Sequence, residues 1–310
     1  MPLLKRKRVL AAKVEATPGT AESLSATEAA FNAYDVMIQA TIEVERREAQ
    51  GQFGSLAGVA GARQGKATFK TDLGWDGTST EPAWATVFLP ACGYVLATNT
   101  FTPRSEAPGA NVKTLTIACY LNGLRKILAG CAGTFKLVAP TGRMPYIEWE
   151  FTGKWVAPTD ATILAPTYPT DSPLRFASGV VEWDNVAQRV EQVTFDAGNE
   201  ITLLEDPTDP SGFSYAVVVE RAPKFSANPE SVLVATQNRW SQWISSTEAT
   251  FELDIAGPTT SVLSIDAPKA QITNVQEGDR GKVVTDEIEW ACNKNTTLDT
   301  DVSIIFTPAA

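Results

Sequence analysis

Alternation of apolar and polar residues recurs along this chain and constrains its fold more than any other feature. Because successive side chains of a β-strand point to opposite faces, such alternation places one face of each strand on a core and the other in solvent. This pattern is typical of antiparallel sheets, and turn-forming pairs such as Asn122-Gly123 separate the segments. The sequence therefore predicts a mainly β protein. The clearest segments are residues 36–44, 115–119, 147–151, 251–255 and 302–306.

Two further segments carry apolar residues at helical spacing. The first begins at Ser79 and Thr80, with Pro82 in its first turn, and the second begins after Asn228, with Pro229 in its first turn. We predict two amphipathic helices that pack on the sheets, and a ligand platform is the alternative role for their aromatic faces. The residues on these faces are Trp84, Val87, Phe88 and Ala91 in the first segment, and Leu233, Thr236, Trp240, Trp243 and Ile244 in the second.

The same order of elements recurs in the two halves of the chain. The triplet Ile-Glu-Trp occurs at residues 147–149 and 288–290, which are 141 positions apart, and Pro82 and Pro229 are 147 positions apart. Similar offsets for separate landmarks indicate an internal duplication. We predict two tandem, similar β-sandwich or β-barrel domains, each with one flanking α-helix. The predicted limits are residues 1–20 for an N-terminal arm, 21–165 for the first domain and 166–310 for the second.

Histidine is missing from all 310 residues. This excludes a histidine general base, a catalytic triad built on histidine and imidazole metal ligands. The chain also has neither a G-x-x-x-x-G-K-[ST] nor a G-x-G-x-x-G segment to cradle nucleotide phosphates. We therefore expect no cofactor and no bound metal.

Acidic residues are concentrated in the second half. Residues 1–165 carry 17 basic and 14 acidic side chains, a net charge of +3, whereas residues 166–310 carry 9 and 22, a net charge of −13. Four of the positive charges form the run Lys5-Arg6-Lys7-Arg8, which is either a solvated terminus or a nucleic-acid or localisation tag. Extended contact with nucleic acid needs a basic stripe that neutralises phosphates, and this acidic chain has none.

The cysteines and the apolar runs indicate a reduced protein outside membranes. The four cysteines are separated by 27, 12 and 161 residues and form no C-x-x-C pair, so we expect buried thiols, with disulfides as an alternative. The longest apolar runs, such as residues 216–219, have the length of strands. We therefore expect no membrane span and no signal-peptide core.

Two groups of carboxylates are candidates for a catalytic pair or a metal site. Glu148 and Glu150 lie at i and i+2 of one predicted strand, roughly 7 Å apart, which is near the spacing of a glycosidase pair. A solvated outer face of the strand is the alternative. Glu205, Asp206 and Asp209 provide hard oxygen ligands for calcium, but without the spacing of an EF-hand, and a plain acidic turn is the alternative.

A glycine-rich connection over residues 46–65 is the most unusual segment. It contains five glycines together with apolar side chains, and a connection of this length between strands is long for a compact domain. An apolar, flexible arm of this kind orders against a neighbouring subunit, and a disordered surface loop is the alternative. The candidate contact residues, from this segment and from the Pro/Asp-rich loop of the second half, are Arg46, Arg47, Phe53, Leu56, Val59, Arg63, Asp206 and Asp209.

Short turn-rich motifs follow one another in order along most of the chain. They are Lys13-Val14-Glu15-Ala16-Thr17-Pro18-Gly19-Thr20, Glu81-Pro82-Ala83-Trp84, Leu89-Pro90-Ala91-Cys92-Gly93-Tyr94, Asp196-Ala197-Gly198-Asn199 and Ala267-Pro268-Lys269-Ala270-Gln271. Together they resemble the tail tube (major tail) proteins of bacteriophages with long, non-contractile tails. The resemblance implies the tail-tube fold and a structural virion protein, not an enzyme. Rings of such a protein stack into a hollow tube through which phage DNA is ejected.

The resemblance also implies partners. Rings of this family usually contain six one-domain subunits, so two similar domains in one chain imply a trimeric, pseudo-hexameric ring, with a plain hexamer as the alternative. The implied partners are further copies of the chain stacked head-to-tail, the tape measure and tail terminator proteins, and DNA that passes non-specifically through an acidic lumen. The implied location is the virion tail, after synthesis and assembly in the host cytoplasm. A carbohydrate-binding or adhesin-type β-sandwich module and a carboxylate-pair glycosidase are the competing functions.

Overall fold

The computed structural model describes residues 6–51, 53–105, 112–296 and 299–309, and these residues form a mainly β protein. This confirms the predicted fold class. The strands of the first half are β1 (Arg8–Val14), β2 (Ala33–Arg47), β3 (Leu56–Asp72), β4 (Tyr94–Ala97), β5 (Thr100–Pro103), β6 (Leu115–Leu121), β7 (Leu124–Pro140) and β8 (Tyr146–Asp160). Helix α1 spans Ala83–Ala91, and a short 3-10 turn spans Thr27–Ala29. Among the described residues, no helix is long and apolar enough to cross a membrane.

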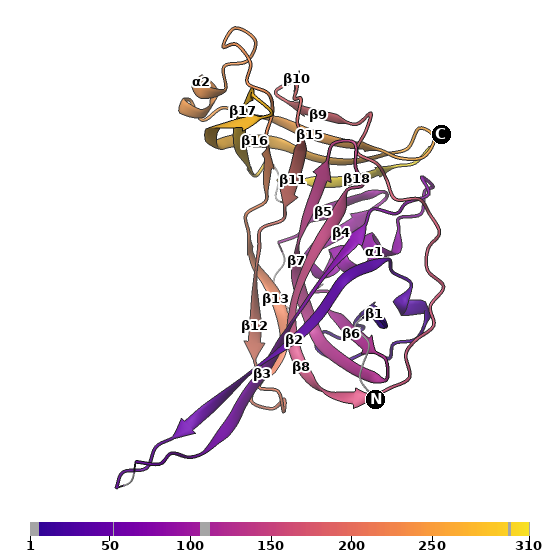
Figure 1. Cartoon of the computed structure of the whole chain (residues 1–310), viewed down its shortest axis with the longest axis vertical. Helices are drawn as coiled ribbons and strands as arrows, with labels where there is room; N and C mark the ends of the chain where they lie inside the picture. The colour runs from indigo at the N-terminus through magenta and orange to yellow at the C-terminus, as the bar shows by residue number, and fades with distance from the viewer. Residues whose placement is uncertain (1–5, 52, 106–111, 297–298, 310) are drawn as a thin grey trace.

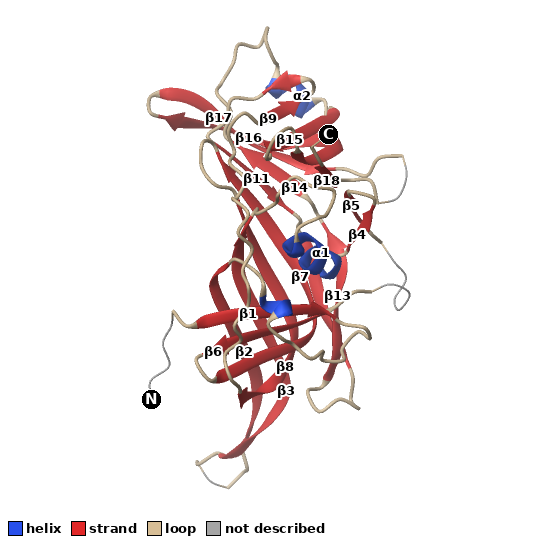
Figure 2. Cartoon of the chain, turned by 90° about the vertical axis from the view of Figure 1, so that its right-hand side faces the viewer, coloured by secondary structure: helices blue, strands red, loops and turns tan. Residues whose placement is uncertain are grey.

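The second half contributes shorter strands and one short helix, α2 (Arg239–Ile244). Its strands are β9 (Val180–Trp183), β10 (Val186–Ala187), β11 (Gln192–Asp196), β12 (Asn199–Glu205), β13 (Phe213–Arg221), β14 (Lys224–Ala227), β15 (Glu248–Ala256), β16 (Val262–Arg280), β17 (Val283–Cys292) and β18 (Ser303–Thr307). Strands prevail in both halves, and α1 lies against the sheet of the first (Figure 2).

One continuous sheet crosses from the first half of the chain to the second. Its strand order is β10-β9-β15-β16-β17-β14-β11-β7-β8-β3-β2. The antiparallel ladder between β7 and β11, which runs from Lys136↔Asp196 to Pro140↔Gln192, joins the halves, and β5 also pairs with β18. In Figure 1 most of the second half lies at the top and most of the first half below it, while β12 and β13 of the second half reach down beside the first half. The limits predicted for two domains, at residues 165 and 166, remain a prediction.

Strand order is consistent with an internal duplication. Four strands of the first half follow the order β2-β3-β8-β7, and four strands of the second half follow the order β11-β14-β17-β16. The two Ile-Glu-Trp triplets take matching places in these sets. Trp149 of β8 lies opposite Phe69 and Phe135, and Trp290 of β17 lies opposite Phe225 and Ile272.

The inward-facing residues of the alternating segments form an aromatic-rich core. Trp149 and Phe151 are buried and stack on Phe69, while Phe88 of α1 covers the same rings at centroid distances of 5.0–5.9 Å. The indole N–H of Trp149 donates to the hydroxyl of Thr71 at 2.9 Å, so its polar atom is also satisfied. Period-two alternation thus correctly identified the core face of β8. In the predicted segment 36–44 it was right only for Val36 and Ile38, which are buried, because β2 extends beyond the core at Ile42 and Val44 and leaves both exposed.

Helix α1 confirms that a helix packs here, but it begins at Ala83 and not at the predicted Ser79 and Thr80, because a residue that precedes a proline disfavours the helical conformation. It follows Pro82 and buries Trp84, Phe88 and Ala91. Pro82 takes an extended conformation as the N-cap residue, as expected for a proline that precedes the first helical hydrogen bond.

The second helix prediction was wrong in its start, although α2 does pack on the sheet, against β16, with Trp243 partly buried on the core. Helix α2 begins only at Arg239, where the side chain of Asn238 accepts a hydrogen bond from the amide of Ser241 at 2.9 Å. Residues 229–231 bond instead to β17 and to the backbone of Arg189. Because these backbone groups are used in long-range pairing, they are not available for helical hydrogen bonds. Several apolar residues of the predicted face, including Leu233, Trp240 and Ile244, are exposed.

The glycine-rich connection is a β-hairpin, which corrects the prediction of a twenty-residue arm. Strand β2 extends to Arg47 and β3 begins at Leu56, with Glu45 opposite Val59. The glycines serve close packing, since a Cβ on Gly58 would lie 2.7 Å from a methyl of Val44. The hairpin projects beyond the rest of the molecule at the lower left of Figure 1.

Part of the predicted N-terminal arm belongs to the sheet. Strand β1 pairs with β6 over seven residues, and Leu10, Ala11 and Ala12 are buried. The guanidinium of Arg8, from the basic run, donates to the backbone oxygen of Val36 at 2.6 Å. Lys5 of the same run lies outside the described residues. The four cysteines are buried and unpaired, as expected for reduced thiols.

A buried carboxylate organises the first sequence motif. Glu15 is 2% exposed and accepts four hydrogen bonds, from the amides of Gly19 and Gly130 and from the hydroxyls of Thr114 and Thr116, at 2.6–2.8 Å. These donors come from three segments of the chain. Glu15 therefore ties the turn after β1 to β6 and β7, a role that alternation alone did not reveal.

Candidate functional site

The tip of the β2–β3 hairpin is an exposed apolar element. Phe53, Leu56 and Val59 are all exposed, and Arg46 and Arg47 lie beside them, also exposed. Exposed apolar side chains grouped on a projecting element mark a contact surface, because leaving them in water is unfavourable. The structure therefore brings five of the eight predicted contact residues together on one projection.

The other three predicted contact residues lie where the base of this hairpin meets the β12–β13 turn. The backbone amide of Arg63 donates to the oxygen of Ser211 at 2.9 Å, and its guanidinium donates to the oxygen of Pro210 at 2.5 Å. Asp209 accepts from Lys154 at 2.7 Å. Arg63 and Asp209 therefore make contacts within the chain, and a role for either residue between copies remains a prediction.

The carboxylates of the acidic turn, which are candidate calcium ligands by sequence, accept local hydrogen bonds. Asp206 accepts from the amide and hydroxyl of Thr208, and Asp209 accepts from the amide and hydroxyl of Ser211. Partial burial acts to raise the pKa of Asp209, but the hydrogen bonds from Lys154 and Ser211 outweigh it and lower this pKa to about 2. In the described part of the chain, no group of three or more Cys, Asp or Glu side chains is placed to hold a metal ion.

The paired glutamates of β8 face lysines on β3. Glu148 lies 2.7 Å from the ammonium of Lys70, and Glu150 lies 2.5 Å from that of Lys66. Lys224 and Glu289 form a similar pair on the second half of the sheet, at 3.5 Å. These cross-strand pairs form a half-exposed face with compensating charges, and they do not favour a glycosidase site.

Two of the unpaired strand edges in the described structure, those of β2 and of residues 273–280 of β16, flank the run β2-β3-β8-β7-β11-β14-β17-β16, and sequence reasoning missed both. Among the described residues β2 pairs only with β3, and residues 273–280 of β16 pair only with β17. Strand β16 shifts register between Ile272 and Asn274, so its first part continues to β15 while its second part ends the sheet. Unpaired edges present rows of backbone donors and acceptors that template pairing with another chain. One sequence signal was the apolar Met37, which is 46% exposed and lies on the face of β2 that points away from the core.

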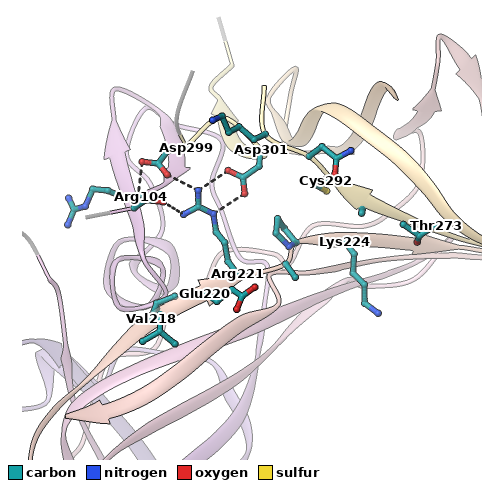
Figure 3. Close-up of a pocket in the computed structure, with 16 residues that line it drawn as sticks. Arg104, Val218, Glu220, Arg221, Lys224, Thr273, Cys292, Asp299 and Asp301 are labelled. Carbon is teal, nitrogen blue, oxygen red and sulfur yellow. Dashed lines mark hydrogen bonds and ion pairs between the residues drawn. The ribbon is translucent and has the colours of Figure 1, made fainter. Parts of the chain in front are cut away.

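A cavity of about 760 Å³ lies beside the second of these edges. Figure 3 shows Val218, Lys224, Thr273 and Cys292 around it, with Arg221 on its wall. The Arg221 guanidinium bonds to Asp299 at 2.7 Å and to Asp301 at 2.9 and 3.0 Å, which makes this wall rigid. The opening is therefore a preformed recess next to residues 273–280.

Three acidic side chains of the second half lie next to one another on neighbouring strands. Glu182, Glu252 and Asp266 lie in register on β9, β15 and β16. Burial, together with the nearby charges of Asp254 and Glu252, raises the pKa of Asp266 to about 7. The charge count of the sequence located this acidity in the second half, and the strand register places it on neighbouring strands.

Comparison with known proteins identifies the family. The family model described as "Phage tail tube protein" matches residues 5–292, which includes both sheet halves, the projecting hairpin and the two unpaired edges. A search of curated proteins found no match. Because the match spans nearly the whole chain, this protein belongs to the phage tail tube protein family.

Proposed function

We propose that three copies of this chain form each ring of the tail tube and that the rings stack head-to-tail. Membership of the family makes the protein a structural component of the virion tail, which self-assembles into the tube with other tail proteins. The observation that supports the number three is the continuous sheet of eight neighbouring strands, β2-β3-β8-β7-β11-β14-β17-β16, with an unpaired edge at each end.

The width of this sheet favours three copies. With strands ~4.8 Å apart and tilted by about 40° in a closed barrel, eight strands span roughly 50 Å of circumference. Three copies then enclose a backbone cylinder roughly 48 Å across, and inward side chains narrow it to roughly 35–40 Å. Two copies would leave a channel roughly 20 Å wide, which is about the width of duplex DNA itself. Six copies would leave a channel roughly 85 Å wide.

The two unpaired edges differ, so the contact between copies is heterologous. The β2 edge of one copy meets the β16 edge of the next, and such a contact closes into a ring when each step turns by one third of a circle. The two similar domains, residues 21–165 and 166–310, then alternate around the ring with pseudo-sixfold symmetry.

We propose that the half-exposed face with the Lys66–Glu150, Lys70–Glu148 and Lys224–Glu289 pairs lines the channel. Charge compensation on this face, within a chain of net charge −10, leaves no basic stripe to release counterions from DNA. DNA would therefore pass without being held.

The hairpin tip, with the acidic β12–β13 turn and the N-terminal arm that was predicted over residues 1–20, is proposed to contact the next ring. Tape measure and tail terminator proteins are the further proposed partners. We place synthesis and assembly of the tube in the host cytoplasm.

Native mass spectrometry and negative-stain microscopy of the purified protein test this proposal. We expect rings with the mass of three 33.3 kDa chains, and tubes at high concentration. Rings of six chains would refute the stoichiometry, and a persistent monomer that binds glycans would favour the adhesin function.

A double variant, Phe53→Ser with Leu56→Ser, tests stacking. We expect rings that no longer form tubes. Met144→Ser is the matched control, because Met144 is similarly exposed but lies in the β7–β8 turn, away from the hairpin. Tubes from the double variant that match those of the control would rule out the hairpin tip as a joint between rings.

A further inference from the structure

We propose that neighbouring copies in the ring are joined by a repeat of the junction that joins the two halves within each chain, with Met37 on β2 of one copy opposite Asn274 on β16 of the next. This inference rests on the proposed ring and adds to it a register and a docking site for the β2–β3 hairpin. The partner is a second copy of the same chain.

The junction within the chain supplies the template. Strands β7 and β11 pair antiparallel, with Lys136 opposite Asp196 and Val138 opposite Thr194. Val138 and Thr194 are each 6% exposed, so this ladder is well covered. The template therefore shows how a β7-like strand of this fold accepts a β11-like strand.

The strand register identifies the counterpart of Lys136 on β16. Trp149 of β8 corresponds to Trp290 of β17, so Glu148 corresponds to Glu289. Lys136 lies opposite Glu148 and Asn274 lies opposite Glu289. Asn274 therefore takes the position of Lys136 on its own free edge.

The same procedure identifies the counterpart of Asp196 on β2. Phe69 of β3 corresponds to Phe225 of β14, because each lies opposite the tryptophan of its triplet, so Thr68 corresponds to Lys224. Met37 lies opposite Thr68, and Asp196 lies opposite Lys224. Met37 therefore takes the position of Asp196, and Tyr34 takes that of Thr194.

Side-chain exposure agrees with this correspondence. Tyr34 is 48% exposed, whereas its counterpart Thr194 is 6% exposed. Gln276 on β16 is exposed, whereas its counterpart Val138 is buried. Positions that are covered at the β7–β11 junction are thus exposed at the free edges of β2 and β16. This is expected when the strand that covers them belongs to another copy. The backbone oxygen of Val36 already accepts a hydrogen bond from Arg8, so the cross-linking test below uses the next residue, Met37.

The junction within the chain also predicts where the β2–β3 hairpin docks on the next copy. Strands β12 and β13 continue β11 and β14 and lie along β7 and β8 of the first half (Figure 1). The side-chain amide of Asn199 donates to the backbone oxygen of Gly133 at 3.0 Å, and a Cβ on Gly130 would lie 2.9 Å from Cα of Tyr215. The internal hairpin is therefore seated on the middle of β7 and on β8.

The equivalent seat on the second half is the recess of Figure 3. Gly133 lies opposite Phe151, and its counterpart Ala270 lies opposite Cys292. Cys292, Asn293 and Lys294 line the recess of about 760 Å³. Residues of β2 beyond Met37 would thus fill this recess in the next copy, as β12 covers the equivalent strands within the chain.

A cysteine pair tests the register. Directly opposite residues of an antiparallel pair have Cα atoms about 4.5–5.5 Å apart, within reach of a disulfide. We expect Met37→Cys with Asn274→Cys to give covalent trimers from oxidised rings on a non-reducing gel. Gln39→Cys with Asn274→Cys is the matched control, because Gln39 lies on the same face but about 7 Å further along the strand. Equal cross-linking of the control pair, or none for the test pair in rings seen by microscopy, would overturn the register.

Hydrogen exchange of the unmodified protein provides a second measurement. Amides of residues 33–37 and 274–278 should become protected when monomers form rings, while amides of the hairpin turn at residues 48–51 should not. Rings without this protection would refute the junction but leave the proposed stoichiometry intact. Failure of the unmodified protein to form rings would refute both.

Discussion

Replacing Glu15 with alanine should destabilise the folded monomer strongly. Its carboxylate accepts hydrogen bonds from two amides and two hydroxyls in an environment where it is 2% exposed. The hydroxyls of Thr114 and Thr116 can rotate toward other acceptors, but the amides of Gly19 and Gly130 cannot. With each orphaned buried amide that had bonded to a charged group costing about 1.5–3 kcal/mol, we expect a loss of about 4 kcal/mol in the free energy of unfolding.

Glutamine at this position should cost less than alanine. It keeps the shape and one acceptor oxygen, but its amide nitrogen faces a backbone N–H, so we expect a loss of about 2 kcal/mol. Glu43→Ala, on the exposed hairpin, is the control and should leave stability unchanged.

Urea unfolding of the unassembled protein, followed by the fluorescence of its eight tryptophans, measures these differences. The expected order of midpoints is Glu43→Ala equal to the unmodified protein, then Glu15→Gln, then Glu15→Ala. A loss below about 1 kcal/mol for Glu15→Ala would refute the reasoning, because it would mean that the four donors find other partners at little cost.

Three further predictions concern other buried groups. Because burial beside Asp254 and Glu252 raises the pKa of Asp266 to about 7, the native state binds this proton more tightly than the unfolded chain, and stability decreases as pH rises through 7. Asp266→Asn should remove this decrease, so its stability relative to the unmodified protein should increase by about 1–2 kcal/mol between pH 5 and pH 8 in urea titrations. Arg239 is 4% exposed and pairs with Asp286, so Arg239→Met should lower the free energy of unfolding by about 3–5 kcal/mol, and a change near zero in calorimetry would contradict a role for the pair. The four buried cysteines should react with a thiol reagent only after unfolding, and fast labelling of the native protein would show that they are accessible.

Strand positions and core faces were predictable from the sequence because they depend on local information. The alternation around Trp149 and Phe251 required no knowledge of partner strands, and both side chains are buried as predicted. Helix α1 was predictable for the same reason, since its proline and its apolar spacing lie within a dozen residues.

The predictions that were wrong concern segments whose structure depends on distant partners. Residues 229–238 have the composition of a helix, but Ser231 donates its amide to the backbone of Val284, more than fifty positions away. The glycines of residues 46–65 suggested flexibility, yet Gly58 allows β2 and β3 to approach closely. In both cases long-range hydrogen bonding or packing overrode the local preference.

By itself the sequence determined the mainly β class, the acidic second half and the exclusion of histidine chemistry, and its motifs resembled the correct family. These properties follow from composition and from a two-residue period, which are independent of how strands pair. Only the tertiary structure decided that the two halves share one sheet through β7 and β11, that the glycine-rich segment is a hairpin, and that β2 and residues 273–280 of β16 have unpaired edges. The physical reason is that strand pairing is set by backbone hydrogen bonds between residues far apart in the chain, and alternation carries no record of which strand lies beside which.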